Sequence, residues 1–378
     1  MAIAAALVLG ACGGGGSPTA PPVTMPPVPG HPVAGFVFYD QDGNGMADSA
    51  EEVRLPGVTV QVGGRSARSE ARGRVVVSDV PAGSHGAAAR PETLPAFFRA
   101  GPAAAVQVPQ AAGSEVAVPA VLPIGSNRPN VYMAFGDSIS AGDGASDGEG
   151  YRSYLQADLR SYWGGAQVVN EGIAGTRSDR GADRIGDSLN RRRPAYSLIL
   201  YGTNDWNRLE CKDEFPCFTI DAIRSMIGAA KAFDSLPVVG TIVPANPAVV
   251  TLAPPERNEW VSRMNDLIRP MVRQEGAVLA DLHAAFLREP SLPSLFVDHV
   301  HPNDRGYQII AQEFFRAITQ PAPAGSARAG AGEEGGPAGE GLFVRPGGRP
   351  GTGRLPGEEG CDSGPCRGSR AGYHGRHP

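Results

Sequence analysis

The chain has 378 residues, enough for two folded domains, and a formal net charge of −5 at neutral pH. Gly (51) and Pro (35) are abundant and gather towards both ends of the sequence, which excludes the ends from a packed core. The mild, dispersed charge gives no sign of a nucleic-acid-binding surface, so we expect no nucleic acid partner.

The amino terminus has the pattern of a targeting segment. Residues 2–11 form an apolar run too short to span a bilayer as a helix. The run ends in Leu9-Gly10-Ala11-Cys12, which is similar to a bacterial lipobox and implies cleavage before Cys12 and lipid on its thiol. We therefore expect residues 1–12 to be a lipoprotein signal peptide and the protein to be lipid-anchored in the bacterial cell envelope, at the outer membrane or cell surface. No Lys or Arg precedes the run, and an ordinary signal peptide of a secreted protein is the alternative.

Residues 13–30 are rich in Gly, Ser, Thr and Pro, which is typical of a flexible tether. Residues 31–124 have a different pattern, in which Gly, Pro and polar residues separate short apolar or alternating stretches. These stretches lie at 35–39, 57–62, 74–77 and 116–121. The pattern predicts a small all-β sandwich domain.

A twelve-residue acidic segment, residues 40–51, lies between the first two stretches and has Gly45 at its sixth position. Oxygen-bearing side chains at positions 1, 3, 5, 9 and 12 are what a hard cation such as Ca²⁺ needs. The expected flanking strands argue against an ordinary EF-hand, and a solvated acidic turn is the alternative. The predicted calcium ligands are Asp40, Asp42, Asn44, Met46 (position 7), Asp48 and Glu51.

This domain resembles the B-type repeats of serine-aspartate adhesins. The resemblance lies in Gly35-Phe-Val-Phe-Tyr-Asp40, in Glu52-Val-Arg-Leu-Pro-Gly57-Val-Thr-Val and in Gly73-Arg-Val-Val-Val77. It implies a β-sandwich, stabilised by structural calcium, that acts as a stalk or spacer.

A short apolar strand, residues 131–135, runs directly into the turn Gly136-Asp137-Ser138. A serine in this position can be a nucleophile. The tripeptide recurs as Gly186-Asp187-Ser188, but in a polar stretch with no strand before it. The context therefore favours Ser138 over Ser188.

Later residues supply what a serine nucleophile needs. A histidine oriented by a carboxylate usually removes the serine proton, and His301 with Asp298 fits these roles. The developing oxyanion needs preorganised donors, for which we predict the Ser138 N–H, Gly172 and Asn204. His299 and His301 would share a face of a strand and could instead bind a metal. No carboxylate or cysteine cluster accompanies them in this segment, so we disfavour a metal and give His299 no role.

These blocks resemble the SGNH (GDSL-type) hydrolases in four motifs and in their order. The matches are Ser138 in Gly-Asp-Ser, Gly172 in Asn-x-Gly, Asn204 in Gly-x-Asn-Asp, and Asp298 with His301 in Asp-x-x-His. The resemblance covers residues 129–319 and implies an esterase or lipase with a Ser-His-Asp triad and no cofactor for catalysis.

The same region alternates apolar strands with helical stripes. Strands are predicted at 131–135, 167–170, 197–201, 237–243 and 277–281. The alternation predicts a parallel α/β sheet with right-handed connections, and the resemblance implies a flavodoxin-like three-layer sandwich. Ser138, Gly172 and Asn204 each follow a strand closely, at the sheet edge where α/β proteins bind ligands.

Export permits disulfides, and four cysteines form two close pairs besides Cys12. Local pairing is the simplest of the three connectivities, and a bridge between Cys211 and Cys217 would brace a loop at the rim of the site. Cys361 and Cys366 lie in a Gly-, Pro- and Arg-rich tail, residues 320–378, which we predict to be disordered.

The expected function is that of an exported, surface-anchored serine esterase, acting as a monomer on small-molecule or glycan substrates that carry acetyl or other short acyl esters. A lipase or lysophospholipase is one alternative. A surface adhesin or scaffold in which the hydrolase fold only binds is another.

Overall fold

A computed structural model describes residues 30–49 and 53–321. The predictions for Cys12, the tether up to residue 29, Glu51 and the tail from residue 322 lie outside the described residues. All described residues belong to one compact unit.

The predicted β region is present as two four-stranded sheets, with strand orders β4-β1-β8-β6 and β3-β2-β5-β7. Valines that alternate along the strands, such as Val60 and Val62 of β2, are fully buried between polar neighbours. The strands are β1 (His31–Tyr39), β2 (Thr59–Val62), β3 (Arg65–Arg68), β4 (Arg74–Val80), β5 (Gly83–Ala89), β6 (Arg99–Ala100), β7 (Ala104–Val108) and β8 (Val116–Val121).

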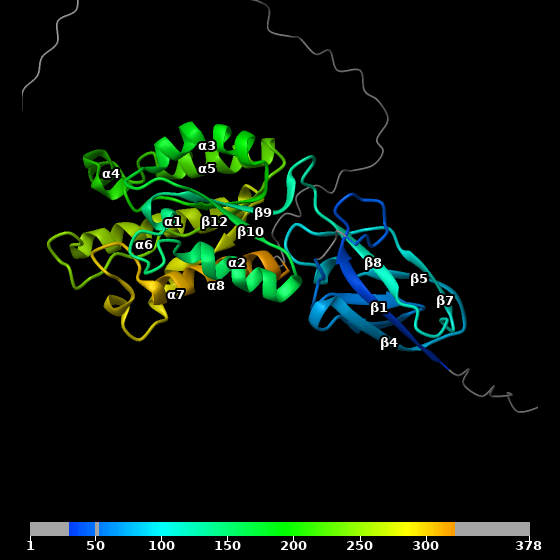
Figure 1. Ribbon diagram of the computed structural model, residues 1–378. Helices are drawn as coiled ribbons and strands as arrows, with labels where there is room; N and C mark the ends of the chain where they lie inside the picture. The colour runs from blue at the N-terminus through cyan, green and yellow to red at the C-terminus, as the bar shows by residue number, and fades with distance from the viewer. Residues whose placement is uncertain (1–29, 50–52, 322–378) are drawn as a thin grey trace, which may run out of the picture. The chain divides into compact units, whose positions relative to one another are not determined.

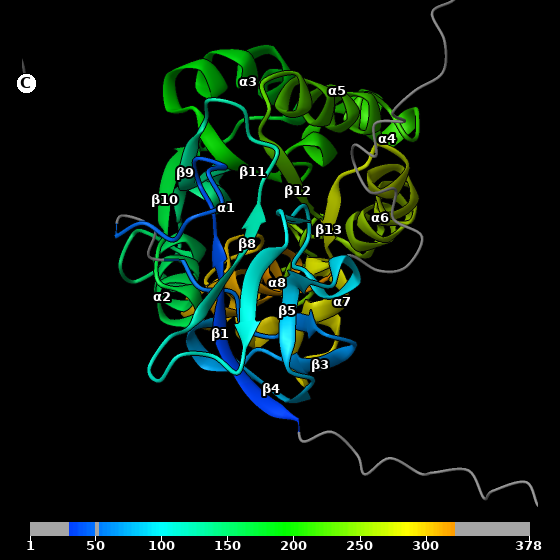
Figure 2. The same cartoon turned by 90° about the vertical axis from the view of Figure 1, so that its right-hand side faces the viewer.

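The second region confirms the predicted α/β fold. Its five strands pair in parallel in the order β10-β9-β11-β12-β13, the arrangement of a flavodoxin-like sheet (Figure 2). The strands are β9 (Arg128–Gly136), β10 (Gln167–Gly172), β11 (Pro194–Leu200), β12 (Leu236–Gly240) and β13 (Val278–Ala280).

Helices cover both faces of this sheet. Those longer than four residues are α2 (Tyr151–Trp163), α3 (Ser178–Arg192), α4 (Leu209–Asp213), α5 (Thr219–Ala232), α6 (Pro255–Gln274), α7 (Leu282–Leu287) and α8 (Asp304–Thr319). Figure 1 shows α3 and α5 on one side of the sheet and α2 and α8 on the other.

Alternate residues of β9 pack into two separate hydrophobic cores. Tyr132 and Ala134 pack in the core that contains residues of α2 and α8. Met133 and Phe135 pack in the core that contains residues of α3, α5 and α6. A strand buried on both faces shows a continuous apolar run, which explains why residues 131–135 have no polar residue.

The two regions touch within the same compact unit. The Arg54 N–H donates to the Trp163 carbonyl oxygen (2.8 Å), and the rings of Phe98 and Trp163 lie edge to face, 6.1 Å apart. The described part of the chain contains no helix long and apolar enough to cross a membrane.

The strand predicted at 237–243 ends at Gly240 in the structure. The apolar run continues to Val243, but from Ile242 onward the backbone bonds side chains of α6 instead of a neighbouring strand: Asn265 bonds both backbone groups of Ile242.

Candidate active site

The sheet register brings the predicted site residues to one edge. Gly136 of β9 lies opposite Gly172 of β10 and opposite Leu200 of β11, so the three strands end together. Ser138 begins the short helix α1 (Ser138–Ala141) just beyond β9, and Asn204 follows β11. The side chain of Asp298 and the ring of His301 reach the same edge from the loop before α8.

Ser138, His301 and Asp298 form a continuous hydrogen-bonded chain. His301 Nε2 lies 2.9 Å from Ser138 Oγ, and His301 Nδ1 lies 2.7 Å from Asp298 Oδ2. Ser138 is only 5% exposed. With a proton on Nδ1, the imidazole presents its free Nε2 to the serine hydroxyl, which is the arrangement that general-base removal of the serine proton requires.

Asp298 is arranged to remain ionised. Burial raises the pKa of its carboxyl group, but hydrogen bonds from His301 and from two backbone N–H groups outweigh burial and lower the pKa to about 2. Those N–H groups belong to Val300 and His301, each 2.8 Å from Asp298 Oδ1. One carboxylate oxygen thus shapes the turn, and the other faces the imidazole.

Gly136 and Asp137, the two residues before the nucleophile in the Gly-Asp-Ser turn, each have a structural role. A Cβ at Gly136 would collide with Ser140 and with the Leu200 carbonyl oxygen, so only glycine fits. Asp137 is the N-cap of α1 and accepts the Ile139 N–H through Oδ1 (3.0 Å). Burial, and to a lesser extent the nearby Asp205, outweigh the Ile139 hydrogen bond and raise the pKa of Asp137 to about 7.

The predicted oxyanion donors lie near the nucleophile, and two of them already have acceptors. The Gly172 N–H donates to Asn170 Oδ1 (2.8 Å). Asn204 Nδ2 donates to the Thr176 carbonyl oxygen (3.0 Å) and to Asp137 Oδ2 (3.3 Å). The Ser138 N–H occupies the first position of α1, where helix geometry provides no acceptor.

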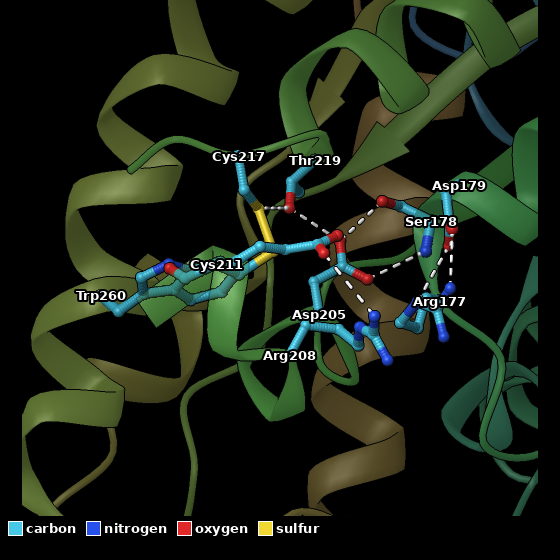
Figure 3. The surroundings of a disulfide bond; sticks show 10 residues. Arg177, Ser178, Asp179, Asp205, Arg208, Cys211, Cys217, Thr219 and Trp260 are labelled. Carbon is cyan, nitrogen blue, oxygen red and sulfur yellow. Dashed lines mark hydrogen bonds and ion pairs between the residues drawn. A yellow bond between two sulfur atoms is a disulfide. The ribbon is translucent and has the colours of Figure 1, made fainter. Parts of the chain in front are cut away.

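The aspartate that follows Asn204 is a structural brace. Asp205 is fully buried and accepts hydrogen bonds from Ser178 N (2.9 Å), Ser178 Oγ (2.6 Å) and Thr219 Oγ1 (2.8 Å). Ser178 and Thr219 are the first residues of α3 and α5, so one carboxylate joins the starts of two helices (Figure 3). Burial raises the pKa of Asp205 despite these hydrogen bonds.

Cys211 and Cys217 form the expected disulfide, next to this brace (Figure 3). The Trp260 Nε1–H of α6 donates to the Cys211 carbonyl oxygen (2.9 Å). The bridge lies within residues 205–219, and the ends of this segment are joined by the hydrogen bond from Thr219 Oγ1 to Asp205.

Two arginines support the site, although no motif or spacing in the sequence marks them. Arg184 of α3 donates through Nη2 to the carbonyl oxygens of Gly136 (3.0 Å) and Glu171 (2.8 Å), which precede Ser138 and Gly172. Arg257 of α6 is 3% exposed and donates to the carbonyl oxygen of Thr203 (2.9 Å), the residue before Asn204. Burial lowers the pKa of Arg257 to about 10, although the nearby Asp298 carboxylate opposes that shift.

The predicted calcium loop has the donor chemistry of a hard-cation site. Asp40 accepts the N–H groups of Gly43 (2.8 Å) and Gly45 (2.9 Å), which folds the loop around its carboxylate. Asn44 Nδ2 donates to Asp42 Oδ2 (2.9 Å) and Asp48 Oδ2 (3.2 Å), so these three predicted ligands lie together. Among residues 30–49 and 53–321, no group of three His, Cys, Asp or Glu side chains is arranged to hold a metal ion. Glu51, the predicted ligand at position 12, lies outside these two ranges.

Comparison with known proteins gives a family for the α/β region. The model of the GDSL-like lipase/acylhydrolase family matches residues 134–309. No curated protein matches the sequence.

Solved structures similar to the chain include an acetylxylan esterase from Geobacillus stearothermophilus, with 20% identity and a TM-score of 0.43 over 51% of this chain and 95% of that one. They also include a lipase/acylhydrolase from Enterococcus faecalis, with 18% identity and a TM-score of 0.42 over 52% of this chain and 100% of that one. The residues matched by the family model include the Gly-Asp-Ser turn of Ser138, Gly172, Asn204, Asp298 and His301, so the α/β region is similar to the GDSL-like lipase/acylhydrolase family.

Proposed function

We propose that the protein is an exported serine esterase that hydrolyses carboxylic esters with Ser138, His301 and Asp298. The observation that carries this proposal is the chain of two short contacts, 2.9 Å from Ser138 Oγ to His301 Nε2 and 2.7 Å from His301 Nδ1 to Asp298 Oδ2.

In the first half-reaction, Ser138 Oγ attacks the ester carbonyl carbon while His301 Nε2 takes the hydroxyl proton. Asp298 keeps the imidazole oriented and stabilises its charged form. The carbon–oxygen bond to the alcohol then breaks, and His301 returns the proton to the departing oxygen. In the second half-reaction water, deprotonated by His301, attacks the acyl-enzyme, and the carboxylic acid and free Ser138 are released.

The tetrahedral intermediates carry a negative oxygen that the Ser138 N–H, the Gly172 N–H and the Asn204 amide stabilise. Asn170, Asp137 and Thr176 hold the last two donors in place before substrate arrives. These acceptors orient the two donors in advance, and the negative oxygen of the intermediate then shares or replaces them.

We favour acetyl and other short acyl esters, on small molecules or on glycans, as the substrates. A protein anchored on the outside of the cell through lipid on Cys12 would meet extracellular glycans directly. The domain works as a monomer in this proposal.

Hydrolysis of longer acyl esters is a second candidate, favoured by one observation. Ile173 directly follows Gly172 and is 48% exposed, and Val297 directly precedes Asp298 and is 56% exposed. Both directly adjoin predicted site residues, where their apolar side chains would contact the acyl chain of a bound ester.

Labelling of the purified full-length chain with a fluorophosphonate tests the reaction class. Wild type and Ser188→Ala should be labelled, whereas Ser138→Ala should not. Ser188 is the matched control, since it belongs to the second Gly-Asp-Ser copy and lies buried in α3. A panel of esters from acetyl to palmitoyl then separates short-chain from long-chain hydrolysis. A folded wild-type chain that is neither labelled nor active on any ester would favour the binding scaffold.

We also propose that Ca²⁺ binds the loop of Asp40, Asp42, Asn44, Asp48 and Glu51 and stabilises the β region. The clustered oxygen donors support this site. Calorimetry should detect Ca²⁺ binding to wild type, and a chelator should lower the Tm of the β region. A chain that binds no Ca²⁺ and melts unchanged with chelator would leave only a solvated acidic turn.

A further inference from the structure

Asparagine side chains support the chain beyond β12. In α6, Asn265 Oδ1 accepts the Ile242 N–H (2.8 Å) and Asn265 Nδ2 donates to the Ile242 carbonyl oxygen (2.9 Å). Asn258 makes the same pair of bonds with Ala245 (2.8 and 3.0 Å). The two asparagines lie two helical turns apart on one face of α6 and replace a neighbouring strand as hydrogen-bonding partners. Residues 242–245 are thus fixed to α6.

The next residue, Asn246, directly contacts the turn that carries Asp298 and His301. The Asn246 N–H donates to the His299 carbonyl oxygen (2.9 Å), and Asn246 Nδ2 donates to the Asp298 carbonyl oxygen (2.9 Å). Asn246 Oδ1 accepts the Ala248 N–H (3.0 Å), which prevents the side chain from rotating freely. Asn246 is 7% exposed, so water competes little for these bonds.

The hydrogen bonds inside the turn do not by themselves fix its place. The Asp298 carboxylate shapes the turn through the N–H groups of Val300 and His301, and its side chain is 42% exposed. Val297 N–H donates to the His301 carbonyl oxygen (3.0 Å), which closes the same turn again. These contacts hold the turn together as a unit. Two bonds from Asn246, together with the packing of Val300 against Ala245 and Ala253, join the turn to the segment that follows β12.

We propose that Asn246 is a positioning residue for the reaction: it fixes the main chain at Asp298 and His299 and so keeps His301 aligned with Ser138. This inference rests on the proposed function, because the alignment matters through proton transfer between Ser138 and His301. Asn246 bonds no side chain of the predicted triad and acts through the backbone alone.

Replacing Asn246 should therefore lower kcat and leave KM almost unchanged. A displacement of reacting groups by about 1 Å can cost about a hundredfold in rate, so we expect kcat to fall about ten- to a hundredfold in Asn246→Ala. Asn246→Asp keeps the volume and the acceptor for Ala248, but it turns an acceptor towards the Asp298 carbonyl oxygen. It should lose at least as much activity, which a loss of packing alone would not produce.

Asn258→Ala is the matched control. It also removes two hydrogen bonds from this segment, one residue away from Asn246, but both of them go to Ala245. It should lower the Tm about as much as Asn246→Ala and leave kcat within about twofold of wild type. Equal losses of kcat in the two variants would overturn the proposal, because they would indicate general loosening of the segment.

A readout without turnover separates this inference from the proposed function. The proton between His301 Nδ1 and Asp298 should give a low-field NMR signal in the resting full-length chain, assigned by its loss in His301→Gln. The signal should shift or broaden in Asn246→Ala and Asn246→Asp, because displacement of the turn alters the contact of the same ring with Ser138 Oγ, and it should persist in Asn258→Ala. An unchanged signal in both Asn246 variants refutes the positioning role.

A wild type that shows the signal but hydrolyses no ester would instead refute the proposed function and leave the positioning role standing. If Asn246→Ala does not fold, Asn246→Asp decides the same comparison.

Discussion

Asp137 gives the most direct test of how burial controls charge beside the nucleophile. The carboxyl group is 1% exposed, and burial raises its pKa from an ordinary value of 3.8 to about 7. Between about pH 4 and pH 7, the unfolded chain has lost this proton while the native chain still binds it. The free energy of unfolding should therefore fall as the pH rises through this window.

The size of the effect follows from the shift. About three pKa units at 1.36 kcal/mol each give a loss of about 4 kcal/mol across the window, or about 1.4 kcal/mol per pH unit. Asp137→Asn cannot titrate, so this slope should be absent from its unfolding free energy. The variant turns a donor towards Asn204 Nδ2, which changes its absolute stability, and the pH slope is therefore the quantity to compare.

Guanidinium unfolding of wild type and Asp137→Asn at several pH values from 4.5 to 8 measures this difference. Other titrating groups cancel, because they are common to both proteins. Asp187→Asn is the control, since Asp187 occupies the same place in the second Gly-Asp-Ser copy but is exposed on α3. It should keep the wild-type slope. Parallel curves for wild type and Asp137→Asn would refute the assignment of a titrating Asp137 near neutral pH.

Three further predictions concern the oxyanion donors and the disulfide. Asn204→Ala should lower kcat about a hundred- to a thousandfold, and steady-state kinetics with near wild-type kcat would exclude it as a donor. Gly172→Ala should lower both Tm and kcat, because a Cβ would lie 2.6 Å from the Ser140 carbonyl carbon; unaltered melting would contradict this packing. Replacing Cys211 and Cys217 together by Ser should reduce the unfolding free energy by about 2 kcal/mol, and equal denaturation midpoints would show that the bridge adds nothing.

The main features of the fold and the proposed triad could be predicted because their signals are local. Strands buried on both faces give continuous apolar runs, and a Gly-Asp-Ser turn directly after such a run marks the end of a strand. Asp298 and His301 are three residues apart, a spacing at which one tight turn brings the carboxylate to the ring. The second Gly-Asp-Ser copy has no strand before it, and the structure places it within helix α3.

The supporting residues could not be predicted, because their partners carry no sequence signal. Arg184, Asn246 and Arg257 bind backbone carbonyl oxygens, which every residue has. The contacts exist only once the sheet has placed these segments side by side. The strand β5 was missed for a related reason: its sequence Gly-Ser-His-Gly-Ala-Ala-Ala has little β-branched or aromatic character, and pairing with β2 and β7 makes it a strand.

The shared carboxylate of Asp205 couples parts of the domain that would otherwise open independently. Ser178 and Thr219 begin two crossover helices, and both depend on this one side chain for hydrogen bonds. Fraying of either helix start would leave a buried carboxylate short of donors, which is costly. The first turns of α3 and α5 and the loop of Asn204 should therefore exchange their amide hydrogens as one cooperative unit.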